Sequence, residues 1–197
     1  ETYSKYIHPM DKSNLAIFGD AATATLISFC EDDNFGDFLY GTDGSGFDKL
    51  IVKNGAGKHK FYAEEELKQY GNDNMFTDNN LYMNGPDVFN FTLSVIPDFT
   101  LQLLEKNKIA LENIDQVIFH QANKFMLNQL RKKIKINQDK FYIDIEDGGN
   151  TVSNTLPIAL KKYSNSKKTN NIENIILVGF GVGLSWSGGL VKISEKL

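Results

Sequence analysis

Val117-Ile118-Phe119-His120-Gln121-Ala122-Asn123 is the stretch that decides the fold. Its first three residues are apolar and partly β-branched, which predicts a short buried strand. Beyond it the pattern is helical, because the apolar residues recur at helical spacing: Met126, Leu127, Leu130 and Ile134.

His120 therefore lies between a strand and a helix, where ligands bind in open α/β sheets. The N-terminal end of a helix disfavours an added proton, so we expect a neutral imidazole that can donate one hydrogen bond to a developing oxyanion. A lone histidine on an apolar segment is more often structural than catalytic. Its neighbours along the chain decide between the two roles.

Composition limits the class of protein. The 197 residues suit one domain or one and a half, and 41% of them are hydrophobic, enough to fill a core. The longest apolar run, Ile175 to Leu184, is far shorter than the roughly 18 residues of a membrane helix, and no signal peptide opens the chain. We therefore expect a cytoplasmic protein without membrane contact.

Charge and cysteine content exclude further classes. A single cysteine rules out an internal disulfide framework, and the three histidines show no metal-ligand spacing, so no metal is predicted. The formal charge of −4 argues against a general nucleic-acid binder.

Two other stretches place polar or glycine residues at strand ends. Asn150 follows a predicted strand, Phe141 to Ile145, and precedes a helix, which puts it on the same rim of the sheet as His120. An asparagine in such a turn is usually only a turn former. Gly179 to Gly183 follows a buried strand, but too few residues come after it for a dinucleotide site. Close backbone approach, with an N–H presented to a bound group, is the better role for these glycines.

The order of the motifs resembles β-ketoacyl-acyl-carrier-protein synthase III, a condensing enzyme with the thiolase fold. The matching stretches are Ile17-Phe18-Gly19-Asp20-Ala21-Ala22, His120-Gln121-Ala122-Asn123, Asp147-Gly148-Gly149-Asn150-Thr151 with Leu156 to Leu160, and Gly179 to Trp186. The resemblance implies an α/β, thiolase-like fold: a mixed β-sheet with helices packed on its faces, as the C-terminal half of the layered αβαβα fold. It divides the chain into the last strands of the N-terminal thiolase half (1–30), a loop and hairpin excursion near the acyl pocket (31–85) and the C-terminal domain (86–197).

The resemblance also implies an acyltransferase reaction. In this family an acyl-coenzyme A and a malonyl-acyl carrier protein undergo a decarboxylative Claisen condensation in fatty-acid or related acyl biosynthesis, without a cofactor beyond the coenzyme A thioester itself. His120 and Asn150 would be catalytic, and the Val182 amide, between Gly181 and Gly183, would form the oxyanion backbone. The family usually has glycine at the Val182 position. The alternative is a non-catalytic acyl or coenzyme A binding module of the same fold.

The nucleophilic cysteine of the family lies upstream of its Gly-Asp motif, and we find no equivalent in this stretch. Cys30 is followed by three acidic residues, which oppose thiolate formation, so a structural role is expected. The sequence therefore indicates a fragment that is inactive alone, and the family forms homodimers.

Acidic carrier proteins would need a basic docking patch. Lys124, Arg131 and Lys132 lie on the helix after His120 and are candidates for it. An ordinary solvated helix face is an equal alternative. The family tends to place arginine at the position of Phe125.

The remaining pattern predicts further elements. A long helix should open at Pro86, contain Pro97 and end near Asn107. Strands are expected at Leu15 to Phe18, Thr23 to Cys30, Lys49 to Lys53 and Ile175 to Val178, an edge or antiparallel strand at Trp186 to Ile193, and a polar surface connection at Lys161 to Asn171.

Overall fold

A computed structural model describes residues 1–29, 31, 34–166 and 171–193. In this part of the chain the main sheet has five strands in the order β1-β9-β8-β6-β7. The β6 strand runs parallel to β7 and β8, whereas β9 runs antiparallel to β8 and β1, so the predicted mixed sheet is confirmed. The strands are β1 (Phe35–Thr42), β6 (Gln116–Phe119), β7 (Phe141–Tyr142), β8 (Glu173–Gly181) and β9 (Ser185–Ile193).

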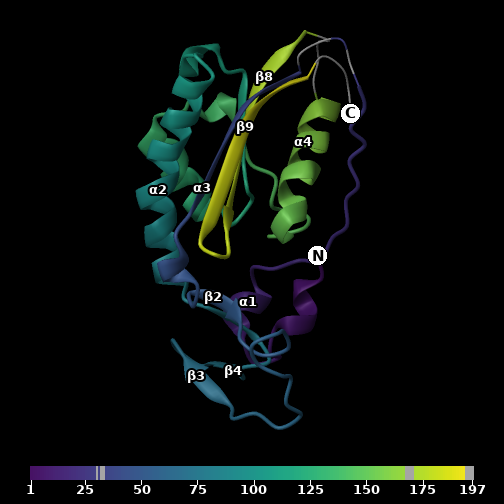
Figure 1. Cartoon of the computed structure of the whole chain (residues 1–197), viewed down its shortest axis with the longest axis vertical. Coiled ribbons are helices and arrows are strands. Elements are labelled where there is room, and N and C mark those ends of the chain that lie inside the picture. Colours follow the sequence, from purple (N-terminus) through teal and green to yellow (C-terminus); the bar gives the residue numbers. More distant parts are fainter. Residues whose placement is uncertain (30, 32–33, 167–170, 194–197) are drawn as a thin grey trace.

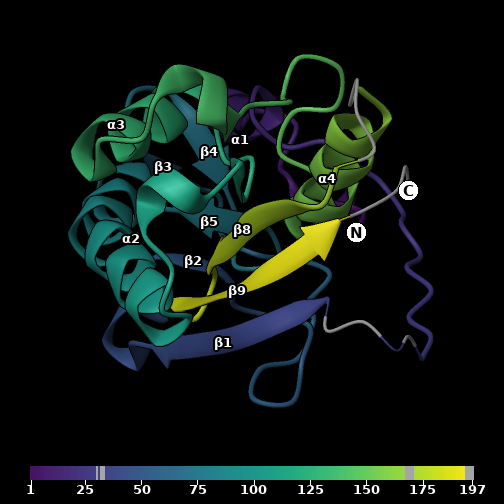
Figure 2. The ribbon, with the colours of Figure 1, turned by 90° about the horizontal axis from the view of Figure 1, so that it is seen from above.

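Helices cover both faces of this sheet (Figures 1 and 2). The helices α2 (Gly85–Lys106) and α3 (Lys124–Ile134) lie on one face and α4 (Thr155–Ser166) lies on the other. Side chains of β6 alternate between the two cores: Val117 and Phe119 pack toward α2 and α3, and Ile118 packs toward α4. All three are fully buried, which explains why these consecutive residues are all apolar.

The predicted long helix is confirmed as α2. Pro86 lies in its first turn, and Pro97 lies inside it. Because proline has no N–H, it removes the helical donor to the carbonyl four residues earlier, that of Leu93. Lys133 of α3 donates to that carbonyl from Nζ at 2.8 Å, so the proline creates a polar contact between two helices.

The excursion lies beyond one end of the sheet, at the bottom of Figure 1. It contains two small antiparallel pairs, β2 (Leu50–Val52) with β5 (Leu81–Met83) and β3 (Lys68–Tyr70) with β4 (Asn74–Phe76). The short helix α1 (Lys12–Leu15) joins this region through buried polar groups, since the Tyr70 hydroxyl donates to the Asp11 carboxylate at 2.7 Å. The 3₁₀ helices are η1 (Tyr3–Tyr6), η2 (Gly44–Gly46), η3 (Leu111–Asn113), η4 (Gln138–Lys140) and η5 (Val152–Asn154).

The prediction that 31–85 consists only of loops and hairpins is wrong for β1, which belongs to the main sheet. The sequence of β1 favours a loop, because glycine and aspartate are depleted in strands and β1 contains Gly36, Asp37 and Gly41. The register shifts between Phe35 and Phe38, and the Asn107 side chain takes over the missing pairing. Its Oδ1 accepts from the Asp37 N–H at 2.7 Å, and its Nδ2 donates to the Asp37 carbonyl at 3.0 Å.

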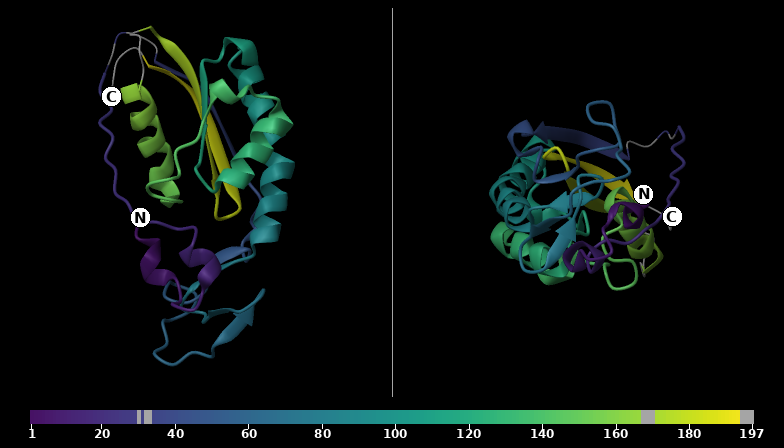
Figure 3. Two further views of the ribbon diagram at one scale, coloured as in Figure 1. Left: turned by 180° about the vertical axis from the view of Figure 1, so that it is seen from behind. Right: turned by 90° about the horizontal axis from the view of Figure 1, so that it is seen from below.

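Residues 23–29 do not form the predicted strand. They run outside the sheet, on the outer side of α4 (Figures 1 and 3), where Leu26 and Phe29 are each 93% exposed. A strand needs a neighbour to take its backbone hydrogen bonds, and the sheet of the described residues offers none there. Cys30 itself lies outside the described residues.

Three smaller expectations also change. The predicted strand at Leu15 to Phe18 is instead the end of α1 followed by a single bridge from Phe18 to Asn150. The helix α4 continues to Ser166, well into the predicted surface connection. The β9 strand is antiparallel as expected, but it lies inside the sheet, because β1 pairs with its outer side. The division into three regions remains a prediction.

Candidate active site

His120 follows the last residue of β6 and faces a cavity of about 870 Å³ at the end of the sheet. Its backbone N–H donates to the Val178 carbonyl at 2.8 Å, which fixes the residue to the neighbouring strand β8. The rings of His120 and Phe180 pack edge to face, with centroids 5.4 Å apart and planes at 85°. The imidazole is therefore held by its backbone and by an aromatic neighbour.

Burial lowers the pKa of His120 to about 4, and a hydrogen bond with the Val152 backbone offsets part of that fall. The imidazole is thus neutral at physiological pH, as expected. Desolvation is the main cause of this lowered pKa.

Asn150 is held by the N-terminal segment. Its N–H donates to the Ile17 carbonyl at 2.9 Å, and its carbonyl accepts from the Gly19 N–H at 3.0 Å. Gly149 adopts φ +63°, and a Cβ at that position would lie 2.8 Å from the Ile17 oxygen, so only glycine fits this turn. The two motifs thus form one structural unit.

Both polar side chains are oriented through one residue, Val152. Its N–H donates to Asn150 Oδ1 at 2.9 Å, and its carbonyl accepts from the Thr155 hydroxyl at 2.8 Å. The Thr155 Oγ1 lies 2.7 Å from His120 Nδ1. Val152 has φ +57°, a conformation that is strained for a β-branched side chain.

Neither Val152 nor Thr155 was a candidate from the sequence. Val152 contacts Asn150 and Thr155 within three residues, but Thr155 meets His120 across 35 positions of the chain, and the local pattern carries no signal for that contact. The same holds for Gln121, which is 1% exposed: its Nε2 donates to the Phe119 carbonyl at 2.5 Å, and its Oε1 accepts from the Asp144 N–H at 2.8 Å. Asn123 could have been recognised as a helix cap, since its side chain accepts from the Met126 N–H at 2.8 Å.

The glycine loop forms another wall of the cavity. Gly181 and Val182 line it, whereas Gly183, with φ +138°, does not. The Val182 side chain is 53% exposed. Across the β1–β9 pair, Gly41 lies opposite Trp186, and a Cβ on Gly41 would enter the indole ring.

The three candidate docking residues of α3 have different surroundings. Lys124 pairs with Glu146 at 3.3 Å. Arg131 turns back to the end of its own helix, where Nη1 donates to the Ile136 carbonyl at 3.1 Å. Lys132 is exposed on the following position.

Two searches of the described ranges gave negative results. Among residues 1–29, 31, 34–166 and 171–193, no group of three histidine, cysteine, aspartate or glutamate residues could hold a metal ion. Within the same ranges, every helix is too short or too polar to cross a membrane.

Comparison with known proteins gives a consistent result. A family model described as 3-oxoacyl-[acyl-carrier-protein (ACP)] synthase III matches residues 1–44. A second model, described as 3-oxoacyl-[acyl-carrier-protein (ACP)] synthase III C terminal, matches residues 104–193. The beta-ketoacyl-[acyl-carrier-protein] synthase III of Clostridium perfringens is 32% identical over 194 residues, which are 98% of this chain and 57% of that protein.

Solved structures agree. A 2.1 Å crystal structure of a 3-oxoacyl-(acyl-carrier-protein) synthase III is 44% identical with a TM-score of 0.88, covering 96% of this chain and 57% of that one. The 3-oxoacyl-(acyl-carrier protein) synthase from Burkholderia xenovorans is 28% identical with a TM-score of 0.77, covering 98% and 54%. The chain thus spans little more than half the length of these relatives. Its fold is thiolase-like, and the chain belongs to the 3-oxoacyl-[acyl-carrier-protein] synthase III family.

Proposed function

We propose that these residues supply the decarboxylating part of an acyltransferase active site of the synthase III type. The reaction is the decarboxylative Claisen condensation of an acyl-coenzyme A with a malonyl-acyl carrier protein, in fatty-acid or related acyl biosynthesis. One observation supports it above the others. Val152 fixes the amide oxygen of Asn150, and Thr155, which is itself bonded to Val152, fixes Nδ1 of His120. Both side chains line the same cavity.

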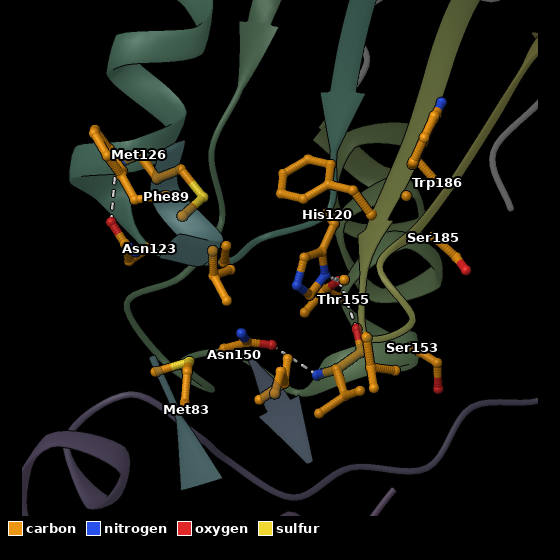
Figure 4. A pocket seen from close by; sticks show the side chains of 18 of the residues that line it. Met83, Phe89, His120, Asn123, Met126, Asn150, Ser153, Thr155, Ser185 and Trp186 are labelled. Atoms are coloured by element: carbon orange, nitrogen blue, oxygen red, sulfur yellow. Dashed lines mark hydrogen bonds between the residues drawn. The ribbon is translucent and has the colours of Figure 1, made fainter. Parts of the chain in front are cut away.

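The orientation of Asn150 follows from its partner. A backbone N–H can bond only to the amide oxygen, so the Val152 contact leaves the Asn150 Nδ2 as the free donor. His120 is neutral and presents its second ring nitrogen to the same cavity (Figure 4). The Asn150 amide and the His120 imidazole are thus two uncharged hydrogen-bond donors in one cavity, which can stabilise an oxygen that gains negative charge.

Decarboxylation creates such an oxygen. When the bond to the malonyl carboxylate breaks, carbon dioxide leaves and the electron pair forms an enolate whose charge rests on the thioester oxygen. Donors already in place stabilise that charge more than they stabilise the ground state, which lowers the barrier. The Val182 amide, with Gly181 and Gly183 shaping its loop, would serve the second oxyanion, which forms when the enolate attacks the acyl group.

The test is decarboxylation by the synthase that contains these residues. Replacing His120 or Asn150 with alanine should each cost roughly 2.7–4 kcal/mol in that step, the usual size for one lost oxyanion donor. The double variant should be only slightly worse than either single one, because both donors serve one charge. Release of carbon dioxide from a malonyl thioester measures the step, and thermal unfolding of each variant controls for folding.

Two results would contradict the proposal. Single variants that unfold would make His120 a structural residue. Thioester binding by wild type without release of carbon dioxide would favour the alternative, a non-catalytic acyl or coenzyme A binding module, for which Val182 in place of the usual glycine is the motivating residue.

The partners are part of the proposal. Acyl-coenzyme A and the malonyl-carrier protein would be substrates, with no separate cofactor. Docking of the carrier by Lys124, Arg131 and Lys132 has weaker support, because Lys124 is paired with Glu146 and Arg131 is bonded to the Ile136 carbonyl just beyond α3. The homodimer and the cytoplasmic location remain predictions.

A further inference from the structure

The Thr155 hydroxyl has two polar neighbours and only one proton to give. It lies 2.8 Å from the Val152 carbonyl and 2.7 Å from His120 Nδ1, and the residue is 3% exposed. The carbonyl can only accept, whereas Nδ1 can donate or accept according to the tautomer. Both contacts are hydrogen bonds at once only if the hydroxyl donates to Val152 and accepts from a protonated Nδ1.

We propose that Thr155 sets the tautomer of His120, so that in the unliganded site the proton is on Nδ1 and the nitrogen facing the cavity, Nε2, is bare. Thr155 is thus a positioning residue: it acts through His120. The left-handed backbone of Val152 directs its carbonyl toward the Thr155 hydroxyl, and this contact favours the tautomer with the proton on Nδ1.

The inference rests on the proposed function for its second step. An oxyanion requires a donor on Nε2, so the bound thioester must reverse the tautomer. The Thr155 hydroxyl then turns its proton from the Val152 carbonyl to Nδ1. Thr155 and His120 remain hydrogen-bonded, but the hydroxyl is now the donor and Nδ1 the acceptor. The Nδ1 proton leaves to water and Nε2 takes one from water through the open cavity, so the charge of the site is unchanged. One hydrogen bond, to Val152, is exchanged for one to the thioester oxygen.

The experiment is nitrogen NMR of the 197-residue chain with ¹⁵N-labelled histidine, in which His120→Gln identifies the signals. Unliganded wild type should show His120 protonated at Nδ1. Thr155→Ser keeps a hydroxyl and should show the same tautomer, as should Val152→Gly, which keeps both backbone groups and tolerates a positive φ. Thr155→Val removes the hydroxyl and leaves the contact of His120 with the Val152 backbone. With one of the two partners lost, the ratio of Nε2–H to Nδ1–H should rise several-fold, toward the tautomer that histidine favours in water.

Two results would overturn the inference: Nε2–H as the main form in unliganded wild type, or a Thr155→Val ratio equal to that of wild type. If Thr155→Val does not fold, Thr155→Ala carries the same comparison. The wild-type spectrum tests the assignment by itself.

A malonyl thioester analogue that cannot lose carbon dioxide separates this inference from the proposed function. On binding to wild type it should move the proton to Nε2. An analogue that binds in the cavity while Nδ1 stays protonated would contradict the oxyanion role of His120. The assignment of the unliganded tautomer to Thr155 would still stand.

Discussion

Acidification should destabilise this fold through His120. The pKa of His120 falls from an ordinary 6.5 to about 4 in the folded chain because burial disfavours the imidazolium. Between these two pH values the unfolded chain binds more protons than the folded one, so stability is lost as the pH falls. The difference of about 2.5 corresponds, at about 1.4 kcal/mol per pH unit, to about 3 kcal/mol lost by the time the pH reaches the folded pKa and below.

Urea unfolding of wild type and His120→Gln across this pH range measures the effect. Carboxylates elsewhere contribute equally to both proteins and cancel in the difference between their free energies of unfolding. That difference should shift against wild type by about 3 kcal/mol from neutral pH to below about pH 4. Stabilities that fall in parallel would refute the reasoning, because His120 would then titrate alike in both states.

Three further predictions concern other parts of the chain. Replacing Asn107 with leucine removes both hydrogen bonds to Asp37 and should lower the free energy of unfolding by about 0.5–1.5 kcal/mol per bond in urea titration; Asn107→Asp keeps the acceptor and should lose less. Gly41→Ala should displace the indole of Trp186, cost about 1–3 kcal/mol and change the emission of this single tryptophan; unchanged emission would show that the strands shift instead. Incubation with radiolabelled acetyl-coenzyme A should leave Cys30 unlabelled, because three acidic residues follow it, and stable labelling would contradict this.

The elements with strong periodicity were predictable. The strand before His120, the helix after it and the long helix from Pro86 all follow from apolar spacing and proline position, because each buries a continuous face. The strand β1 was missed, since Gly41 leaves room for the Trp186 ring of β9, and Asp37 obtains its backbone hydrogen bonds from the Asn107 side chain. Residues 23–29 show the reverse error: a strand-like pattern does not form a strand without a neighbour.

The site divides in a similar way. The motif order led to His120 and Asn150, and both line the same cavity. The groups that orient them did not emerge from the sequence, because Val152 acts through its backbone N–H and carbonyl, and because tertiary folding brings the Thr155 hydroxyl to His120. The docking role of Lys124, Arg131 and Lys132 stays a prediction, and the contact of Arg131 with the Ile136 carbonyl is one that sequence patterns do not reveal.

The strand order has a consequence for synthesis of the protein. A ribosome delivers β1 before every other strand of the described main sheet, yet the neighbour of β1 is β9, the last strand made, and Phe35 pairs with Val191. During translation β1 therefore has an unsatisfied edge while β6, β7 and β8 emerge and find one another. Closure of this side of the sheet waits until β9 has left the exit tunnel, which makes the nascent chain dependent on protection of that edge until then.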